Sequence, residues 1–346
     1  MKHWITIFSI ITICYMPVFA GQDSKSELAL GQSWEFVKNI EKLKPRDSSG
    51  EVFFKDNIFI YGGWYDSNFQ NLSDGVRINP TSGLMETFEL GNVPFLDIPV
   101  ALVFKGMVFL TSGWVDGRKT TARPSNDIIV SADGVNFSKA GNGAFSPRVG
   151  AAGVVFKEKV YIIGGTEQYH NGDRKSLLND VWSSSDGVNY SIVTTSANFL
   201  PRAFHQAFVH GGKLCVIGGG SYKPDSFAYN DLWCSRNGKD FDLIVQNLPF
   251  TPRIWFSVIV HDGYVWVLGG DDIKNRKLLN DIWVSKDLIN WAEVKFEKIW
   301  SPRHEHSAVL VKDTIYIVGG NASPLSNEIW KYKIPKGFER SILRNK

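Results

Sequence analysis

The feature that most constrains this chain is a pair of small residues that recurs six times, at intervals of 50 to 54 residues. An apolar stretch precedes each pair. The pairs are Gly62-Gly63, Ser112-Gly113, Gly164-Gly165, Gly218-Gly219, Gly269-Gly270 and Gly319-Gly320. A fixed period of this length indicates stacked structural units that share their core with their neighbours. We therefore expect one domain of six units.

Two further motifs repeat with the same period. A proline followed by an arginine stands 17 residues before five of the pairs, and the second unit has Phe95-Leu96 instead. These are Pro45-Arg46, Pro147-Arg148, Pro201-Arg202, Pro252-Arg253 and Pro302-Arg303. An Asn-Asp-x-Trp motif follows the pair, as at Asn179-Asp180, and hairpin dipeptides such as Asp186-Gly187 come after it. The spacing predicts four short antiparallel strands in each unit.

With these motifs the chain resembles the kelch-repeat family, whose propellers are similar to that of galactose oxidase. The resemblance covers residues 32–335. It implies an all-β fold, a six-bladed kelch-type β-propeller with four antiparallel strands in each blade. The sixth unit lacks a fourth strand, whereas residues 33–38 match no strand of their own unit. We expect residues 33–38 to complete the last blade and so to remove an exposed sheet edge.

The ends of the chain suggest export. Residues 1–20 are predicted to be a signal peptide, because Lys2 precedes an apolar run over residues 4–15 and Ala20 fits a cleavage site. Residues 21–31 are expected to be a linker and residues 336–346 a basic tail. No later apolar run is long enough to span a membrane. The mature protein is expected to be periplasmic or secreted, monomeric and without a cofactor.

The net charge limits the classes of partner to be expected, and the cysteine content limits the possible disulfides. The net charge of +3 falls by one when Lys2 is removed, and so mild a balance argues against a nucleic-acid partner. Cys215 and Cys234 remain in the mature chain and fall on neighbouring predicted strands. They could form a disulfide or pack as two small buried residues, and the sequence leaves both alternatives open.

One face of the expected propeller is the better candidate for a site. The connections before each first strand and after each second strand emerge on this face. Arg46, Arg148, Arg202, Arg253 and Arg303 are expected to surround the mouth of the central channel there, where they would suit an anionic or hydroxyl-rich ligand. The alternative is that each arginine pairs with a carboxylate of the Asn-Asp motif and serves the scaffold. The other candidate ligand-binding residues on this face are Trp64, Asp66, Trp114, Asp116, Glu167, Tyr169, Tyr222, Trp255 and Asp271.

Three residues near the arginines could act as acid or base. His205, Glu305 and His306 depart from the repeat, and histidine titrates near neutral pH. Alternatively, the histidines only line the channel. No metal site is expected, because the histidines sit in different units and residues 304–306 should alternate between the two faces of a strand.

Three functions are compatible with these residues. The first is a non-catalytic binding module for a glycan, a peptide or a partner protein. The second follows from a similarity in export signal and fold to the kelch-type N-acetylneuraminate mutarotases, and would need an arginine to hold the sugar carboxylate. The third, a copper radical oxidase, would require a Cys–Tyr cross-link, for which Cys215 and Cys234 are poorly placed.

Overall fold

The described chain is built almost entirely of β-strands. The computed structural model describes residues 27–29, 33–39, 43–65, 70–91, 93–94, 96–117, 119–169, 173–223 and 225–338. Within these ranges the helical residues are those of the 3₁₀ turn η2 (Arg174–Ser176) and Phe338, the last residue described. No helix among these residues has the length and apolar character needed to cross a lipid bilayer.

Six sheets in the described ranges contain at least four strands each. The first three are β3 (Gly50–Phe54), β4 (Asn57–Tyr61), β7 (Asp74–Ile78) and β8 (Met85–Glu89); β10 (Val100–Phe104), β11 (Met107–Thr111), β14 (Asp127–Ser131) and β15 (Ser138–Asn142); and β16 (Ala152–Phe156), β17 (Lys159–Thr166), β18 (Leu177–Ser184) and β19 (Ser191–Thr194).

The other three are β20 (Gln206–His210), β21 (Lys213–Ile217), β24 (Leu232–Ser235) and β25 (Asp242–Val245); β26 (Ser257–His261), β27 (Tyr264–Asp272), β28 (Lys277–Ser285) and β29 (Trp291–Lys295); and β30 (Ser307–Val311), β31 (Thr314–Val318), β32 (Glu328–Lys333) and β2 (Glu35–Asn39). The four strands named for each sheet are antiparallel to their neighbours, and apart from β2 the strands of one sheet come from one repeat of the sequence.

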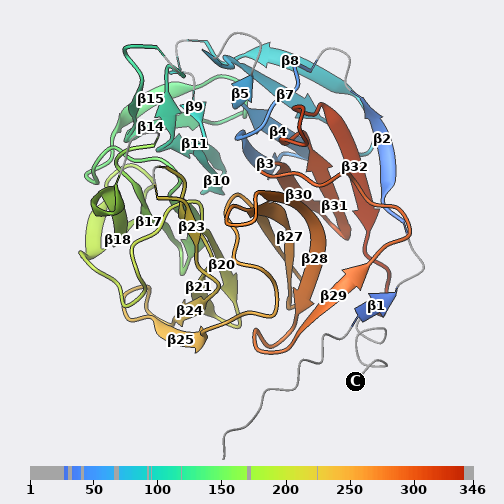
Figure 1. Ribbon diagram of the computed structural model, residues 1–346. Helices are drawn as coiled ribbons and strands as arrows, with labels where there is room; N and C mark the ends of the chain where they lie inside the picture. The colour runs from blue at the N-terminus through green and yellow to red at the C-terminus, as the bar shows by residue number, and fades with distance from the viewer. Residues whose placement is uncertain are drawn as a thin grey trace, which may run out of the picture.

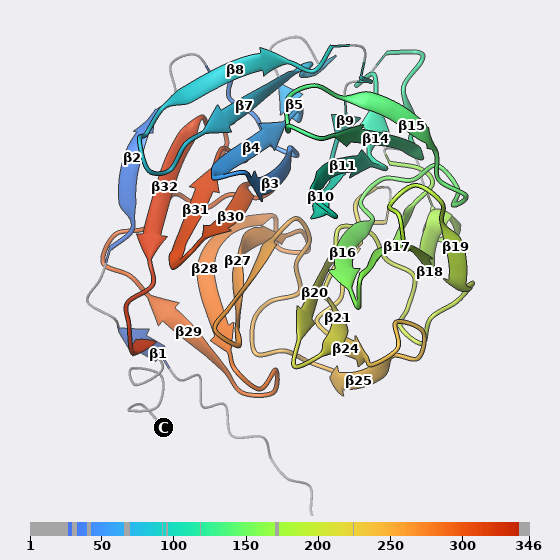
Figure 2. The ribbon, with the colours of Figure 1, turned by 180° about the vertical axis from the view of Figure 1, so that it is seen from behind.

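The six sheets are arranged around a common centre. The first strands β3, β10, β20 and β30 lie toward the middle, and β2, β8, β15, β25 and β29 lie on the outside (Figure 1). Neighbouring first strands contact one another in the order β3, β10, β16, β20, β26 and β30, and β30 contacts β3 again. The view from behind shows the same closed arrangement (Figure 2).

The core is divided into layers between successive sheets. One apolar cluster lies between each pair of neighbours; for example, Trp266 of the fifth sheet and Trp330 of the sixth belong to one cluster. The second strand of a sheet is buried on both sides, as at Ile58–Tyr61. Both faces of this second strand must therefore be apolar, which explains why the strand before each small-residue pair is almost continuously hydrophobic.

A belt of backbone hydrogen bonds links each sheet to the next. The N–H of the second residue of each small-residue pair donates to a carbonyl of the following unit, over 2.8–3.2 Å. The acceptors are Leu96, Arg148, Arg202, Arg253, Arg303 and Arg46. Gly63 shows why the donor is glycine: its φ is +99°, and a Cβ would lie 2.3 Å from the carbonyl oxygen of Asp47. The first residue of the pair has φ near +60°, which Ser112 also adopts.

The N-terminal part of the described chain contributes two strands. β2 pairs antiparallel with β32, with Glu35 opposite Lys331, and forms the fourth strand of the sixth sheet. Trp34, which precedes β2, is fully buried against Trp300 and Tyr332. Residues 21–31 are not entirely the expected linker, because β1 (Glu27–Ala29) pairs in parallel with the outer strand β29. β1 thus covers an edge that would otherwise be open.

Small sheets build up one face of the molecule. They are β5 (Trp64–Tyr65) with β6 (Gln70–Asn71), β9 (Leu96–Asp97) with β12 (Trp114–Val115) and β13 (Arg123–Pro124), and β22 (Gly220–Ser221) with β23 (Phe227–Ala228). Antiparallel bridges also join the residue after each Pro-Arg motif to the loop after the small-residue pair, as between Asp47 and Trp64 or between His304 and Asn321. We call this the loop face.

Candidate functional site

The five arginines of the Pro-Arg motif do not line a channel mouth, and their expected role in ligand binding is wrong. All five side chains are buried, with 0–1% of their surface exposed. Each forms an ion pair within its own sheet, at 2.5–2.8 Å between nitrogen and oxygen. The pairs are Arg46–Asp74, Arg148–Asp180, Arg202–Asp231, Arg253–Asp281 and Arg303–Glu328. The arginines therefore serve the scaffold.

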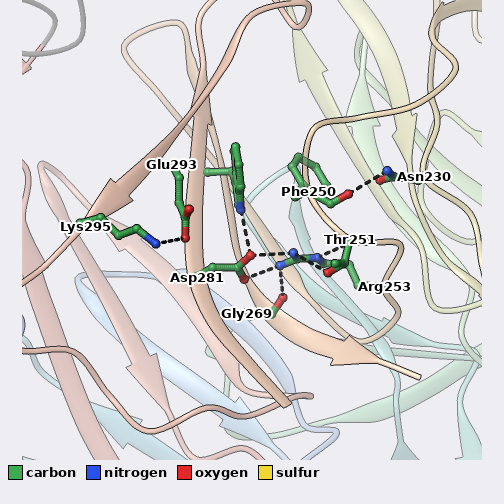
Figure 3. A network of polar contacts seen from close by, with 9 residues as sticks. Asn230, Phe250, Thr251, Arg253, Gly269, Asp281, Glu293 and Lys295 are labelled. Atoms are coloured by element: carbon green, nitrogen blue, oxygen red, sulfur yellow. Dashed lines mark hydrogen bonds and ion pairs between the residues drawn. The ribbon is translucent and has the colours of Figure 1, made fainter. Parts of the chain in front are cut away.

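Arg253 illustrates how each of these side chains is fixed (Figure 3). Its guanidinium donates two hydrogen bonds to the Asp281 carboxylate, at 2.6 and 2.8 Å. It also donates to the carbonyls of Gly269 and Thr251. The indole N–H of Trp283 donates to the same carboxylate over 2.8 Å. A guanidinium held in this way has its donors satisfied inside the protein and presents none to a ligand.

Cys215 and Cys234 are joined by a disulfide between β21 and β24. They stand directly opposite each other in the strand register, with their Cα atoms 4.0 Å apart. The bridge lies in the fourth sheet, among buried apolar side chains such as Phe208 and Ile217. It therefore belongs to the core and not to the loop face.

A cavity of about 380 Å³ opens on the loop face over the centre of the ring. It is lined by Asp47, Ser48, Trp64, Asp97, Tyr169, Tyr222, Trp255, Asp271, His304, Glu305, Asn321, Ser323, Pro324 and Leu325. A second cavity of about 190 Å³ shares Ser48, Trp255 and Glu305 with it and extends between the first strands. We call these the loop-face cavity and the central channel.

The loop-face cavity has two chemically different halves. The acidic half contains Asp47 and Asp97, from the first and second units, and Glu305, from the sixth. The aromatic half contains Tyr169, Tyr222 and Trp255, from the third to the fifth units; the rings of Tyr222 and Trp255 are 4.8 Å apart. Among its described lining residues there is no lysine or arginine, so the cavity favours positively charged or hydrogen-bond-donating groups.

Left-handed backbone at one repeated position brings the acidic groups together. The second residue after the arginine position has φ between +51° and +65° in all six units, including Ser48, Trp255 and Glu305. Such a conformation is unfavourable for residues other than glycine, and it interrupts the alternation of side chains along a strand. His304 and Glu305 consequently lie on the same side, and their Nδ1 and Oε2 atoms are 2.8 Å apart.

The pKa values of groups in the acidic half are shifted by burial and by the charges of their neighbours. Burial, reinforced by the negative charge of Glu305, raises the pKa of Asp47 to about 8. Burial also raises the pKa of Asp97 well above its ordinary value, with further contributions from Glu305 and Asp47. The pKa of His304 is raised as well: burial lowers it, but the hydrogen bond and charge of Glu305 and the charge of Asp47 outweigh that effect. Perturbed groups of this kind are typical of functional sites.

His205 and His306 do not belong to this cluster. Both line the central channel and are buried, with 2% and 3% of their surface exposed. Burial, together with the charges of Arg202 and Arg303 respectively, lowers the pKa of each histidine to about 3. Both are therefore neutral at physiological pH, and the expected role as acid or base is wrong for these two residues.

The structure brings together some of the other predicted site residues. Trp64, Tyr169, Tyr222, Trp255, Asp271 and Glu305 line the loop-face cavity. Trp114, Asp116 and Glu167 are not among its lining residues. The indole N–H of Trp114 donates to the carbonyl of Gly117, and its ring packs on Tyr169. Asp66 lies outside the described residues.

Sequence reasoning did not assign the other lining residues to a site. They are Asp47, Ser48, Asp97, His304, Asn321, Ser323, Pro324 and Leu325. Asp47 and Asp97 directly follow the arginine position of their units, where the third, fourth and fifth units have the apolar Val149, Ala203 and Ile254. A comparison of this one position across the six units would have singled out the two aspartates.

Comparisons with known proteins give little guidance on family. No family model matches the chain. The chain is similar to the Ras guanine nucleotide exchange factor F of Dictyostelium discoideum, with 29% identity over 114 residues. These residues make up 30% of this chain and 10% of that protein, so the chain matches only a tenth of its relative's length.

Proposed function

We propose that this protein is an exported, six-bladed β-propeller of the kelch type that acts as a non-catalytic binding module. The proposed fold is supported by the six repeated sheets, by the closed sequence of contacts between their first strands and by the completion of the sixth sheet by β2. Export is supported by the sequence of residues 1–20.

The ligand that fits the loop-face cavity best is a neutral glycan. The observation that carries this proposal is the division of the cavity into an acidic half and an aromatic half. Carboxylates accept hydrogen bonds from sugar hydroxyls, while aromatic rings offer flat apolar faces on which the C–H face of a sugar can pack. Concave sites that combine aromatic walls with a few polar groups are typical binding pockets.

The same arrangement weighs against the mutarotase alternative. That activity would need a cation to hold the carboxylate of N-acetylneuraminate, but the arginines are buried in ion pairs and the described cavity lining carries none. Glu305 would repel a sugar carboxylate, and Asp47 and Asp97 beside it supply no positive charge to hold one. His205 and His306, with pKa values of about 3, would be poor proton donors and acceptors at neutral pH.

A glycan array with the purified protein tests the proposal, with neutral and sialylated oligosaccharides on the same surface. We expect binding to neutral glycans only. Asp271→Asn should weaken that binding, because Asp271 lines the cavity, whereas Glu158→Gln, in the exposed turn between β16 and β17, should not. Failure to bind any neutral glycan, or anomer exchange of N-acetylneuraminate faster than in buffer by NMR, would overturn the proposal.

A further inference from the structure

Three potential metal ligands meet where the first and sixth sheets adjoin. Asp47, His304 and Glu305 each present one ligand atom, and these atoms all lie within 4.8 Å of one another. Asp47 comes from the first unit, and the other two from the sixth. The N–H of Ser48 donates to the carbonyl of Glu305 over 3.1 Å, which ties the two segments together at this point.

Buried oxygens without hydrogen-bond partners are a second sign that a ligand is missing beside this cluster. Oδ1 of Asp47 and Oδ1 of Asp97 accept no hydrogen bond from the described residues, and only 4% and 3% of these residues is exposed. Both aspartates line the loop-face cavity. Burying an ionised carboxylate away from water without a compensating partner costs roughly several kcal/mol of free energy. The lining residues described supply no lysine or arginine to offset this cost.

Neighbouring groups hold the three side chains in position. The hydroxyl of Ser48 donates to Oε1 of Glu305 over 2.6 Å, and the amide of Asn321 donates to Oδ2 of Asp47 over 3.3 Å. The indole of Trp255 stacks on the His304 ring, with centroids 4.9 Å apart. Each of these contacts uses an atom or face that a cation would not need. Such outer partners orient ligands in established metal sites.

We propose that Asp47, His304 and Glu305 bind a divalent cation of the Mn²⁺ or Zn²⁺ class. One imidazole nitrogen with two carboxylate oxygens favours these ions over Ca²⁺, which prefers oxygen ligands alone. Ligand atoms bonded at about 2.0–2.2 Å to one ion lie about 2.8–3.6 Å apart in tetrahedral or octahedral geometry, so atoms that are now up to 4.8 Å apart must move closer by about 1 Å when the ion binds. The metal site does not depend on the identity of an organic ligand.

The remaining coordination positions of the cation would face the loop-face cavity. Resting on the proposed function, we infer that adjacent hydroxyls of a neutral sugar occupy them, while Trp255 and Tyr222 contact its apolar face. Asp97 could accept a hydrogen bond from a hydroxyl or a water bound to the cation. The cation would thus neutralise the acidic half and also hold the ligand.

Titration calorimetry on the full chain, after dialysis against EDTA, tests the metal site. We expect one Mn²⁺ or Zn²⁺ to bind, with a rise in Tm that Mg²⁺ and Ca²⁺ at the same concentration do not produce. Asp47→Asn and Glu305→Gln should weaken binding by at least about 10-fold. The matched control is His261→Gln: His261 lies 3.4 Å from a carboxylate oxygen of Asp313, at the other ends of β26 and β30, and its loss should change nothing.

Each outcome has a defined meaning. Equal responses to all four cations, binding that His261→Gln abolishes, or a Tm raised by tetramethylammonium but by none of the metals would overturn the proposal. If Asp47→Asn does not fold, Ser48→Ala removes only the hydroxyl that donates to Glu305 and should still weaken metal binding about 10-fold. Glycan binding that persists in EDTA would contradict the inferred role of the cation in holding the sugar but leave the proposed function intact. Metal binding without glycan binding would support the metal site and contradict the proposed function.

Discussion

The buried ion pair between Arg202 and Asp231 provides the most direct test of how the repeat holds each sheet together. Arg202 has no exposed surface, and it donates hydrogen bonds of 2.6 and 2.9 Å to the carboxylate and 2.9 Å to the carbonyl of Gly218. Asp231→Asn keeps the shape of the side chain but removes its charge, leaving a buried guanidinium without a counter-ion. Breaking a buried pair from one side costs about 3–5 kcal/mol.

This cost is large against the total stability of a protein, which is about 5–15 kcal/mol. At roughly 2–4 °C per kcal/mol, Asp231→Asn should lower Tm by on the order of 10 °C. Urea unfolding followed by circular dichroism gives the free energy directly. The matched control is Glu86→Gln, which breaks the pair of Arg77 and Glu86, both about half exposed, and should cost less than about 1 kcal/mol.

The second unit shows what replaces the pair when it is absent. Leu96 occupies the arginine position there and is buried, and Asp127 pairs instead with Lys139 at 2.8 Å. We therefore expect that replacing Arg202 and Asp231 together by leucine destabilises the protein less than Asp231→Asn alone, because no charge is left buried. If Asp231→Asn costs no more than Glu86→Gln, or if the double variant is the worse of the two, our account of the arginines is wrong.

Two further predictions concern pH and ring closure. His205 has a folded pKa of about 3 against an ordinary value of 6.5, so the stability it contributes is complete above pH 6.5 and is lost as pH falls toward 3. At pH 5 the wild type should have lost about 2 kcal/mol relative to His205→Gln, and parallel pH profiles of unfolding for the two proteins would contradict this. Deleting residues 21–40 removes β2 and the fully buried Trp34, whose loss alone is worth about 3–5 kcal/mol, and should lower Tm by on the order of 10 °C; an unchanged Tm would refute the role of β2.

The repeating parts of the structure could be predicted because each obeys a local rule six times. The small-residue pair is needed wherever the backbone turns left-handed against the next sheet, as at Gly63, and the apolar strand before it is needed wherever a strand is buried on both faces. The Asn-Asp motif had a clear structural role too. Asn230 donates to the carbonyls of Leu248 and Phe250, and Asp231 accepts from Arg202.

The candidate site could not be predicted in the same way, because it depends on how the units differ. The arginines repeat, and repetition alone does not reveal that they are buried. Alternation along a strand wrongly separated His304 from Glu305, since a left-handed residue at Glu305 was not evident from the sequence. The arginines were expected to suit an anionic or hydroxyl-rich ligand, whereas the cavity is lined by acidic groups such as Asp47 and Asp97 and by no arginine among the described residues.

The pairing of β2 with β32 brings two distant parts of the chain together and makes a circular permutation of the chain feasible. Glu35, at the start of β2, lies opposite Lys331, near the end of β32, so a short peptide could join these two strand ends. New termini could then be opened at the exposed Glu158, far along the chain. Such a circular permutant would make the sixth sheet from one uninterrupted stretch and leave the third held together by pairing alone. Its folding would show that the closed ring of contacts, rather than the covalent order of the units, defines this molecule.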